Sequence, residues 1–182
     1  MLSKKTQPIS RSRSFTPERA RQIMGNYPKM LVVYPGKCTA CGRCMLHCSY
    51  THDQVNNPLK ARIHIVRYEP YVDSPVVCWQ CGICINSCPI GVIKRNRATG
   101  AVVIDEKKCN GCGQCQLVCP IGAITMDPTR LVALKCDLCG GDPACVKGCP
   151  YKALGYERPE NAAYYRRLQV GLVLGRKEIV GR

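Results

Sequence analysis

Sixteen cysteines, set out in four copies of one spacing, constrain this chain more than any other feature of its sequence. In three copies, three cysteines stand at every third position and a fourth follows four positions later. The remaining copy is stretched, with five residues between its second and third cysteines. Glycine directly follows the second cysteine of every copy, and proline follows the last cysteine of all but the first. The four copies, motifs one to four, comprise Cys38, Cys41, Cys44 and Cys48; Cys78, Cys81, Cys84 and Cys88; Cys109, Cys112, Cys115 and Cys119; and Cys136, Cys139, Cys145 and Cys149.

This spacing is typical of [4Fe–4S] ligation, because one short loop that offers a thiolate every third residue can reach three iron corners of a cubane. Glycine after the second cysteine allows positive φ and a close approach of backbone N–H groups to the cluster. Zinc sites ordinarily use two separated C-x2-C pairs, and disulfides give no reason for glycine and proline at fixed offsets. We therefore expect four [4Fe–4S] clusters held by all sixteen cysteines.

Such clusters would replace much of a conventional core, since the 182 residues include only one Phe and one Trp. Cysteine-rich chains form disulfides in oxidising compartments or bind metal in reducing ones. Residues 1–28 are basic and polar, with no apolar run of signal-peptide length, and the apolar stretch at 170–174 is too short to span a bilayer. We therefore expect a cytoplasmic protein without a membrane span.

The formal net charge of +15 would by itself favour a nucleic-acid or membrane partner. Four clusters, each carrying about −2 when oxidised and −3 when reduced, would lower that charge to about +7 or +3. We expect the basic excess mainly to compensate buried anions, and we expect no nucleic-acid partner.

Short regular elements are predicted around the motifs. Apolar runs on both sides of Gly100 predict a hairpin between Ile93 and Ile104, and helices of a single turn are expected between the third and fourth cysteines. Thr16 and Pro17 form a helix start that Gly25 would end. Further short strands are expected at 31–34, 62–68, 123–126 and 131–134, and a helix at about 162–173.

Residues 70–130 resemble a bacterial two-cluster ferredoxin, and 30–157 as a whole resemble the four-cluster iron–sulfur subunits of complex oxidoreductases. Within that family, Cys48–His52 and Lys135–Pro143 are most similar to the small subunits of tungsten-pterin aldehyde oxidoreductase and benzoyl-CoA reductase complexes. Motif one departs from the ferredoxin pattern, because Ser49 stands where the other motifs have proline.

The resemblance implies that the fourth cysteine of each motif ligates the other cluster of its pair. We name the implied ligand sets site A (Cys38, Cys41, Cys44 and Cys149), site B (Cys136, Cys139, Cys145 and Cys48), site C (Cys78, Cys81, Cys84 and Cys119) and site D (Cys109, Cys112, Cys115 and Cys88).

The fold class implied is α+β, with two ferredoxin-like βαβ dicluster lobes of short strands and one-turn helices and with extensions at both termini. The outer lobe would comprise 29–69 and 128–157, and the inserted lobe 70–127. Residues 1–28 would form an N-terminal extension, and 158–182 a C-terminal tail that binds the partner.

The resemblance implies a non-catalytic electron-transfer subunit of anaerobic metabolism. It would relay single electrons between a large catalytic subunit, of the tungsten- or molybdenum-pterin type, and an external carrier, with a flavin subunit or a ferredoxin as a further partner. Three alternatives stay open: a free polyferredoxin, a subunit of a hydrogenase, formate or carbon-monoxide dehydrogenase system, and a zinc-binding nucleic-acid module. The sequence leaves open the substrate, the direction of electron flow and the cluster potentials.

Other residues near the motifs have two readings each. Lys37, Lys108 and Lys135 precede the first cysteines of motifs one, three and four. Their charge offers a way to raise cluster potentials, but a solvated surface position is ordinary for lysine and is what we expect. Trp79 is expected to shield its cluster from water, and His52, which has no ligand spacing, to be a packing or surface residue.

Overall fold

Eight short strands pair two by two into four antiparallel ribbons in the computed structural model, which describes residues 28–34, 36–69 and 72–175. The ribbons pair β1 (Met30–Val33) with β8 (Leu154–Glu157), β2 (His64–Tyr68) with β3 (Val72–Val76), β4 (Ile93–Arg95) with β5 (Val102–Ile104), and β6 (Thr125–Met126) with β7 (Ala133–Leu134).

The strands expected next to the motifs are confirmed, although β6 and β7 are shorter than expected. In the expected hairpin, Ile93 of β4 faces Ile104 of β5, and Gly100 adopts φ +70° in the connection. Two strands were not expected from the sequence, namely β3, which contains Pro75, and β8.

The helices between third and fourth cysteines are short in three motifs, as expected, but not in the first. The short ones are α3 (Ile83–Ser87), α4 (Gln114–Leu117) and α5 (Ala144–Lys147), and 3-10 turns occur at Pro58–Lys60 and Leu138–Gly141. The expectation of a single turn is wrong for α2 (Arg43–Asp53), which has 11 residues. Because Ser49 keeps a backbone N–H and lacks the ring of proline, the helix continues to its cap at Gln54.

The last described helix, α6 (Pro159–Gly175), is longer than the 162–173 expected and packs against β1. The rings of Tyr34 and Tyr165 meet edge to face at 4.6 Å between centroids. The helix expected from Thr16 to Gly25 lies outside the described residues.

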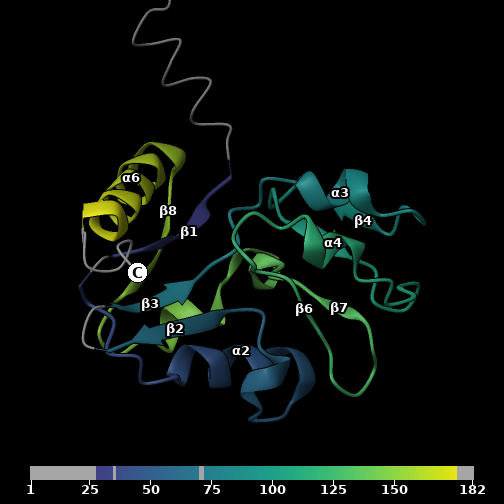
Figure 1. Cartoon of the computed structure of the whole chain (residues 1–182), viewed down its shortest axis with the longest axis horizontal. Helices are drawn as coiled ribbons and strands as arrows, with labels where there is room; N and C mark the ends of the chain where they lie inside the picture. Colours follow the sequence, from purple (N-terminus) through teal and green to yellow (C-terminus); the bar gives the residue numbers. More distant parts are fainter. Residues whose placement is uncertain (1–27, 35, 70–71, 176–182) are drawn as a thin grey trace, which may run out of the picture.

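Segments far apart in the sequence lie together in two groups (Figure 1). Helix α2 of motif one packs against α5 of motif four, and β1 pairs with β8. Helices α3 and α4 of motifs two and three pack against each other at the opposite end of the molecule (Figure 1). The lobe boundaries expected at 69/70 and 127/128 lie between β2 and β3 and between β6 and β7.

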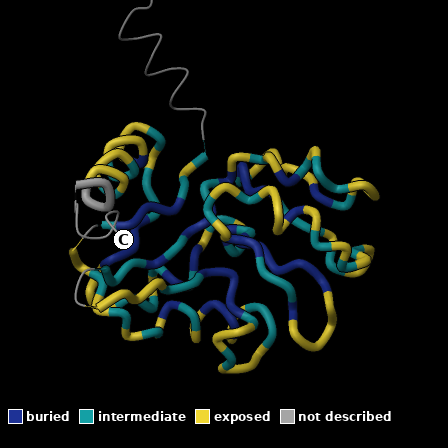
Figure 2. Tube along the Cα trace, viewed as in Figure 1, coloured by how far each residue is buried: buried dark blue, intermediate teal, exposed yellow. Residues whose placement is uncertain are grey.

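Cysteines form a large part of the buried interior, which runs along the middle of the molecule (Figure 2). One buried group combines Cys44, Cys48, Cys78, Cys136 and Cys145 with aliphatic residues of the strands. A second, smaller group combines Cys84 and Cys115 with residues of β4, β5 and β7. The thiols therefore lie where a conventional core would place large apolar side chains.

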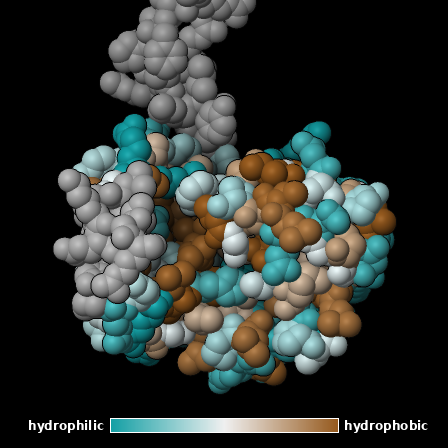
Figure 3. Space-filling view, in the orientation of Figure 1, coloured by the Kyte–Doolittle hydropathy of each residue, from teal (hydrophilic) through white to brown (hydrophobic). Residues whose placement is uncertain are grey.

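Large apolar side chains remain exposed on the surface that carries α3 and α4, where Figure 3 shows hydrophobic residues gathered. Leu117 of α4 is 80% exposed, and Ile83 of α3 and Ile90, which follows α3, are about half exposed. Within the described residues, no helix has both the length and the apolar character needed to cross a membrane.

Candidate metal centres

Each cysteine loop contains left-handed backbone positions at two equivalent places, and the loop of motif four has two more, at Cys139 and Gly141. The glycines after the second cysteines, Gly42, Gly82, Gly113 and Gly140, adopt φ between +67° and +90°, which confirms the role expected for them. The residue directly before the second cysteine also has positive φ in all four loops, namely Ala40, Gln80, Gly111 and Leu138. These reversals fold each loop tightly, so that its first three cysteines are near one another.

Site A lies in a pocket formed by motifs one and four. Cys38, Cys41 and Cys44 line it together with Cys149, which follows α5. Apolar residues complete the lining, among them Ile65 of β2. Three thiols from one loop and a fourth from a distant motif therefore line one pocket.

Site D lies in an equivalent pocket formed by motifs two and three. Cys109, Cys112 and Cys115 line it together with Cys88 of motif two. Isoleucines of β4 and β5 close its apolar wall. The four cysteines in this pocket are those that the resemblance implies for site D.

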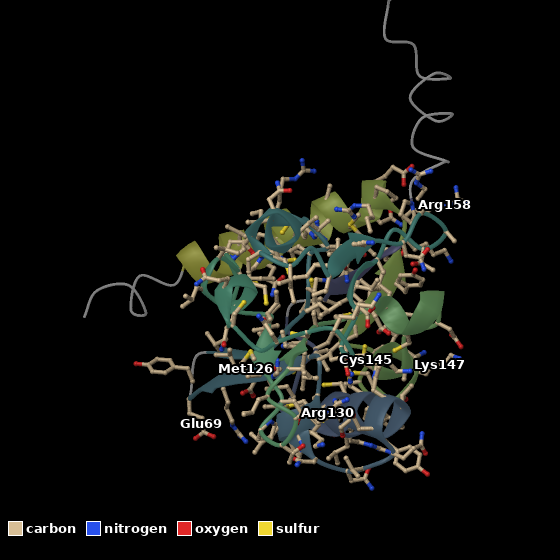
Figure 4. The ribbon with its side chains drawn as sticks, turned by 90° about the vertical axis from the view of Figure 1, so that its right-hand side faces the viewer. Glu69, Met126, Arg130, Cys145, Lys147 and Arg158 are labelled. Carbon is tan, nitrogen blue, oxygen red and sulfur yellow. The ribbon has the colours of Figure 1, made fainter. Side chains whose placement is uncertain are left out.

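Site B is the most buried of the four. Cys145, labelled in Figure 4, lies in the interior of the molecule. Burial, reinforced by the nearby thiols of Cys48 and Cys139, raises its pKa. Cys136, the first cysteine of motif four, is also buried, and burial raises its pKa well above the usual value. A backbone N–H from Arg62 donates to the sulfur of Cys48 at 3.2 Å.

His52 connects the two motifs that form site B. Its Nε2 lies 2.9 Å from a carboxylate oxygen of Asp137, and its Nδ1 lies 2.8 Å from the carbonyl oxygen of Cys48. Asp137, with the thiols of Cys139 and Cys48, raises the pKa of His52 to about 12. His52 is therefore a charged partner of Asp137 beside the thiols, which corrects the expectation of a simple packing or surface residue.

Site C is built mainly from motif two, and its Cys84 belongs to the same buried group as Cys115 of site D. Burial, reinforced by the thiols of Cys78, Cys81 and Cys115, raises the pKa of Cys84 to about 11, while Lys135 opposes the rise. Cys119, the fourth cysteine implied for this site, packs against both buried groups, one containing Cys78 and the other Cys84.

The donor set fits iron–sulfur clusters. The protein fold alone disfavours buried thiolates, since burial raises the pKa of Cys44 to about 11, and bound metal would supply the compensating positive charge. Backbone N–H groups that can stabilise thiolates point at five sulfurs. These donor–sulfur pairs are Ala40–Cys38 and Gln80–Cys78 at 3.4 Å, and Arg62–Cys48, Ala123–Cys119 and Ala153–Cys149 at 3.2 Å.

Electrostatic contacts between thiols place the four sites in a row. Cys44 of site A acts on the pKa of Cys145 of site B, and Cys78 of site C acts on that of Cys136 of site B. Cys115 of site D acts on the pKa of Cys84 of site C. These pairs link the sites in the order A, B, C, D, and exposed cysteines occur at three of them, namely Cys41 at site A, Cys81 at site C and Cys112 at site D.

The lysines that precede the motifs differ in placement. Lys37 and Lys108 are exposed, as expected. The surface position expected for Lys135 is wrong, because this residue is only 5% exposed and its Nζ donates three hydrogen bonds. Trp79 is partly buried, and the guanidinium of Arg166 in α6 lies 5.7 Å from the centroid of its ring.

Comparison with known families supports the same cofactor. Residues 74–123 and residues 101–150 each match a family described as a 4Fe-4S dicluster domain. The chain therefore carries four [4Fe–4S] clusters on its sixteen cysteines, and the zinc alternative is set aside.

Several curated proteins are similar to most of the chain. The polyferredoxin-like subunit of aliphatic sulfonate oxidoreductase from Pyrococcus furiosus is 36% identical over 121 residues, which are 65% of this chain and 70% of that protein. The beta subunit of NADH-dependent phenylglyoxylate dehydrogenase from Aromatoleum evansii is 32% identical over 136 residues. That match spans 72% of this chain but only 30% of the larger protein.

A solved structure also aligns with the chain. It is the active site complex BamBC of benzoyl coenzyme A reductase with bound benzoyl-CoA, at 26% identity and a TM-score of 0.44. The alignment covers 84% of this chain and 94% of that chain.

Proposed function

Because the chain belongs to the polyferredoxin-like iron–sulfur proteins with 4Fe-4S dicluster domains, we propose that it relays single electrons for a catalytic partner in an oxidoreductase complex. The observation that carries this function is the row of four neighbouring thiol sites, in which buried thiols of adjacent sites share common buried groups. Neighbouring sites suit passage through the protein better than storage at isolated sites.

The ligand sets that we propose are sites A to D, as defined above. The pockets lined by the cysteines of sites A and D support crossed ligation, since each combines three thiols of one motif with the fourth thiol of another. When bound, the clusters supply the uptake and release of single electrons, which a polypeptide lacks. The residues of the chain hold them, exclude water through the apolar walls and stabilise sulfur charge through N–H groups.

We extend the proposal to two lobes, the outer one of 29–69 and 128–157 and the inserted one of 70–127. The packing of α2 on α5 and of α3 on α4 supports this division. We also propose that residues 1–28 and 158–182 contact the partner and that the complex is cytoplasmic. Part of α6 packs on β1, so the partner would contact the faces of α6 that do not pack on β1.

For the partner, we propose a large catalytic subunit with tungsten or molybdenum on a pterin, together with a flavin subunit or ferredoxin as carrier. The names of the relatives support a catalytic partner, because two of them are subunits of oxidoreductases. A free polyferredoxin is the second candidate, and the exposed apolar side chains on α3 and α4 favour a bound subunit over it.

Crossed ligation is tested by removing one fourth cysteine at a time. In Cys88→Ala, we expect the thiols of Cys109, Cys112 and Cys115 to become reactive, while those of motif two stay protected. In the reciprocal variant Cys119→Ala, the thiols of motif two should become reactive instead. The measurement is anaerobic alkylation followed by peptide mass spectrometry, alongside an iron and sulfide count, which should be about 16 of each in the unaltered protein.

Two outcomes contradict the proposal. Exposure of Cys78, Cys81 and Cys84 in Cys88→Ala would mean that each loop keeps its own fourth cysteine. If the native protein were isolated anaerobically without iron and sulfide, the proposed electron relay would be wrong.

A further inference from the structure

A buried lysine lies where the two groups of motifs meet. Lys135 follows β7 and directly precedes Cys136 of site B, and it is only 5% exposed. Its side chain reaches Gln80 in the loop of motif two and Val102 of β5, which are 55 and 33 residues away in the sequence. Lysine is rarely buried without a specific partner, so this position needs a physical explanation.

The ammonium group of Lys135 has a complete set of acceptors. Its Nζ lies 2.6 Å from the carbonyl oxygen of Val102, 2.9 Å from Oε1 of Gln80 and 3.1 Å from the carbonyl oxygen of Cys136. An ammonium has three donors and no acceptor, whereas a neutral amine would turn its lone pair toward one of these oxygens. The surroundings therefore suit the charged form.

Gln80 is held in a single orientation. Its Oε1 accepts from the backbone N–H of Val102 at 2.9 Å, and its Nε2 donates to the carbonyl oxygen of Cys136 at 3.0 Å. Because a backbone N–H can only donate, the amide cannot be flipped without losing both bonds. Gln80 thus joins the loop of motif two, which carries Cys78 and Cys81, to the loop of motif four.

No carboxylate forms a salt bridge with Lys135 among the residues that the structure describes. Arg62, a comparably buried cation, contacts Asp53 and Glu106, and His52 contacts Asp137. The Nζ of Lys135 instead donates to the carbonyl oxygen of Cys136 in site B and to Oε1 of Gln80, which lies between Cys78 and Cys81 of site C. Its counter-charge must come from the two sites on either side of it.

We propose that Lys135, oriented by Gln80, is a fixed positive charge between sites B and C that favours one-electron reduction at these two central sites. This inference rests on the proposed relay. A positive charge stabilises the more anionic, reduced form of a neighbouring cluster, and a buried charge is weakly screened. The electron would then be held most favourably where it has to cross from one lobe to the other.

Lys135→Met tests this role with a side chain of similar length and no charge. Gln80 Oε1 and the Cys136 carbonyl each keep another hydrogen-bond partner in this variant. The matched control is Lys108→Met, since Lys108 also precedes the first cysteine of a motif but has a side chain that is 75% exposed. Both proteins are titrated anaerobically with a reductant series while reduced clusters are followed by electron paramagnetic resonance.

We expect the reduction equilibrium of one or two clusters to fall at least tenfold in Lys135→Met, a shift of about 59 mV for one electron. The other clusters, and all clusters of Lys108→Met, should stay within twofold of the unaltered protein. Four clusters whose equilibria all stay within twofold in Lys135→Met, at full iron content, would overturn the assignment, and so would an equal shift in the control.

Gln80→Glu provides a second variant if Lys135→Met loses clusters. It keeps Lys135 and an oxygen for Val102 N–H, and it adds a negative charge beside the ammonium, so the same clusters should shift downward. Intact clusters with unshifted equilibria, or failure of both variants to assemble clusters while Lys108→Met does, would overturn the electrostatic role. Failure of the relay itself is distinct, since it would show as missing iron in the unaltered protein.

Discussion

At the scale of single residues, the cysteine loops depend on left-handed backbone positions that only partly coincide with glycine. The glycine after each second cysteine was predictable, because the spacing itself calls for a reversal there. The position just before the second cysteine was not, since Ala40, Gln80 and Leu138 adopt positive φ with ordinary side chains. Only Gly111 carries glycine at that position.

Gly111 has a second requirement, a close approach of another backbone segment. A Cβ at this position would lie 2.0 Å from the carbonyl oxygen of Leu131, whereas a Cβ at Gly113 would meet nothing within 4 Å. Both glycines have similar φ, +71° and +75°. Comparing alanine substitutions at these two glycines therefore separates the cost of left-handed backbone strain from the cost of steric overlap.

We predict that Gly111→Ala destabilises the protein by about 2 kcal/mol more than Gly113→Ala, which itself costs about 1–2 kcal/mol for a left-handed alanine. For a chain of this size, that difference corresponds to a Tm lower by about 4–8 °C. Thermal unfolding of both variants with clusters loaded, under anaerobic conditions, provides the measurement. Equal Tm values for the two variants would show that the Leu131 segment moves aside freely.

Lys135 is another residue whose placement the sequence did not reveal. Lys37, Lys108 and Lys135 occupy the same position relative to their motifs, but only one is buried. The difference arises from Gln80 and from Val102, which tertiary folding brings together from distant segments. A local pattern contains no information about such neighbours.

At the scale of elements, the presence or absence of one proline explains the lengths of the helices. The three short helices end before Pro89, Pro120 and Pro150, and α2 continues through Ser49. Ser49 is fully buried, and its Oγ donates to the carbonyl oxygen of Leu46 and accepts from the N–H of Asn57. The greater length of α2 could have been predicted from the sequence, because motif one has Ser49 where the other motifs have proline.

Strand β3 was missed for a different reason. Its sequence includes Asp73, Ser74 and Pro75, which are unfavourable in strands. Proline is tolerated at an edge, and both strands of a two-stranded ribbon are edges. Strand β8 was missed because it is defined by its pairing with β1, which lies more than 120 residues earlier.

A network of ion pairs ties the turn between β6 and β7 to the rest of the molecule. Asp127 is fully buried and accepts hydrogen bonds from Thr129 and Arg130. Arg130, labelled in Figure 4, also contacts Asp53 at the end of α2 and Glu106 after β5. The network therefore joins segments from both groups of motifs.

We predict that Asp127→Asn destabilises the protein by about 3 kcal/mol at pH 7. The substitution removes the negative charge that pairs with the Arg130 guanidinium, and it weakens the hydrogen bonds that the carboxylate accepts in the turn. Although burial opposes ionisation, the N–H groups of Arg130 and Thr129, the hydroxyl of Thr129 and the Arg130 side chain hold the pKa of Asp127 well below its usual value. A depressed folded-state pKa contributes stability above the unfolded-state value of about 3.9, and this contribution is lost as the pH falls further.

The difference in unfolding free energy between the two proteins should therefore be constant from pH 7 to pH 5 and decrease only below about pH 4. Chemical denaturation at several pH values measures it. A difference that already decreases between pH 7 and pH 5 would show that the Asp127 carboxylate is not the group responsible.

At the scale of the whole molecule, the clusters take the place of a core. The two buried groups of residues are rich in cysteine, and the segments that carry them come from both ends of the sequence. The four motifs and their cofactor could be predicted from spacing alone. The order of the four sites could not, because it depends on tertiary packing such as that which places Cys78 of motif two and Cys136 of motif four in one buried group.

That order determines what the loss of one site should do. Site D is at one end of the row, and its Cys115 lies in the same buried group as Cys84 of site C. If electrons pass along the row, Cys115→Ser in the assembled complex should reduce electron transfer between the partner and its natural carrier at least about tenfold, which corresponds to 1.36 kcal/mol in barrier.

The reaction of the same complex with a small dye that exchanges electrons at the catalytic subunit or at an earlier site should be much less affected. Both rates are measured on one anaerobic preparation, after the metal and cofactor content of the catalytic partner has been found equal to that of the unaltered complex. Loss of the natural reaction with retention of the dye reaction places site D on the path, because the catalytic centre is then intact. An assembled complex that lacks the site D cluster but serves its natural carrier at the original rate would place site D off the path and refute a relay through all four sites.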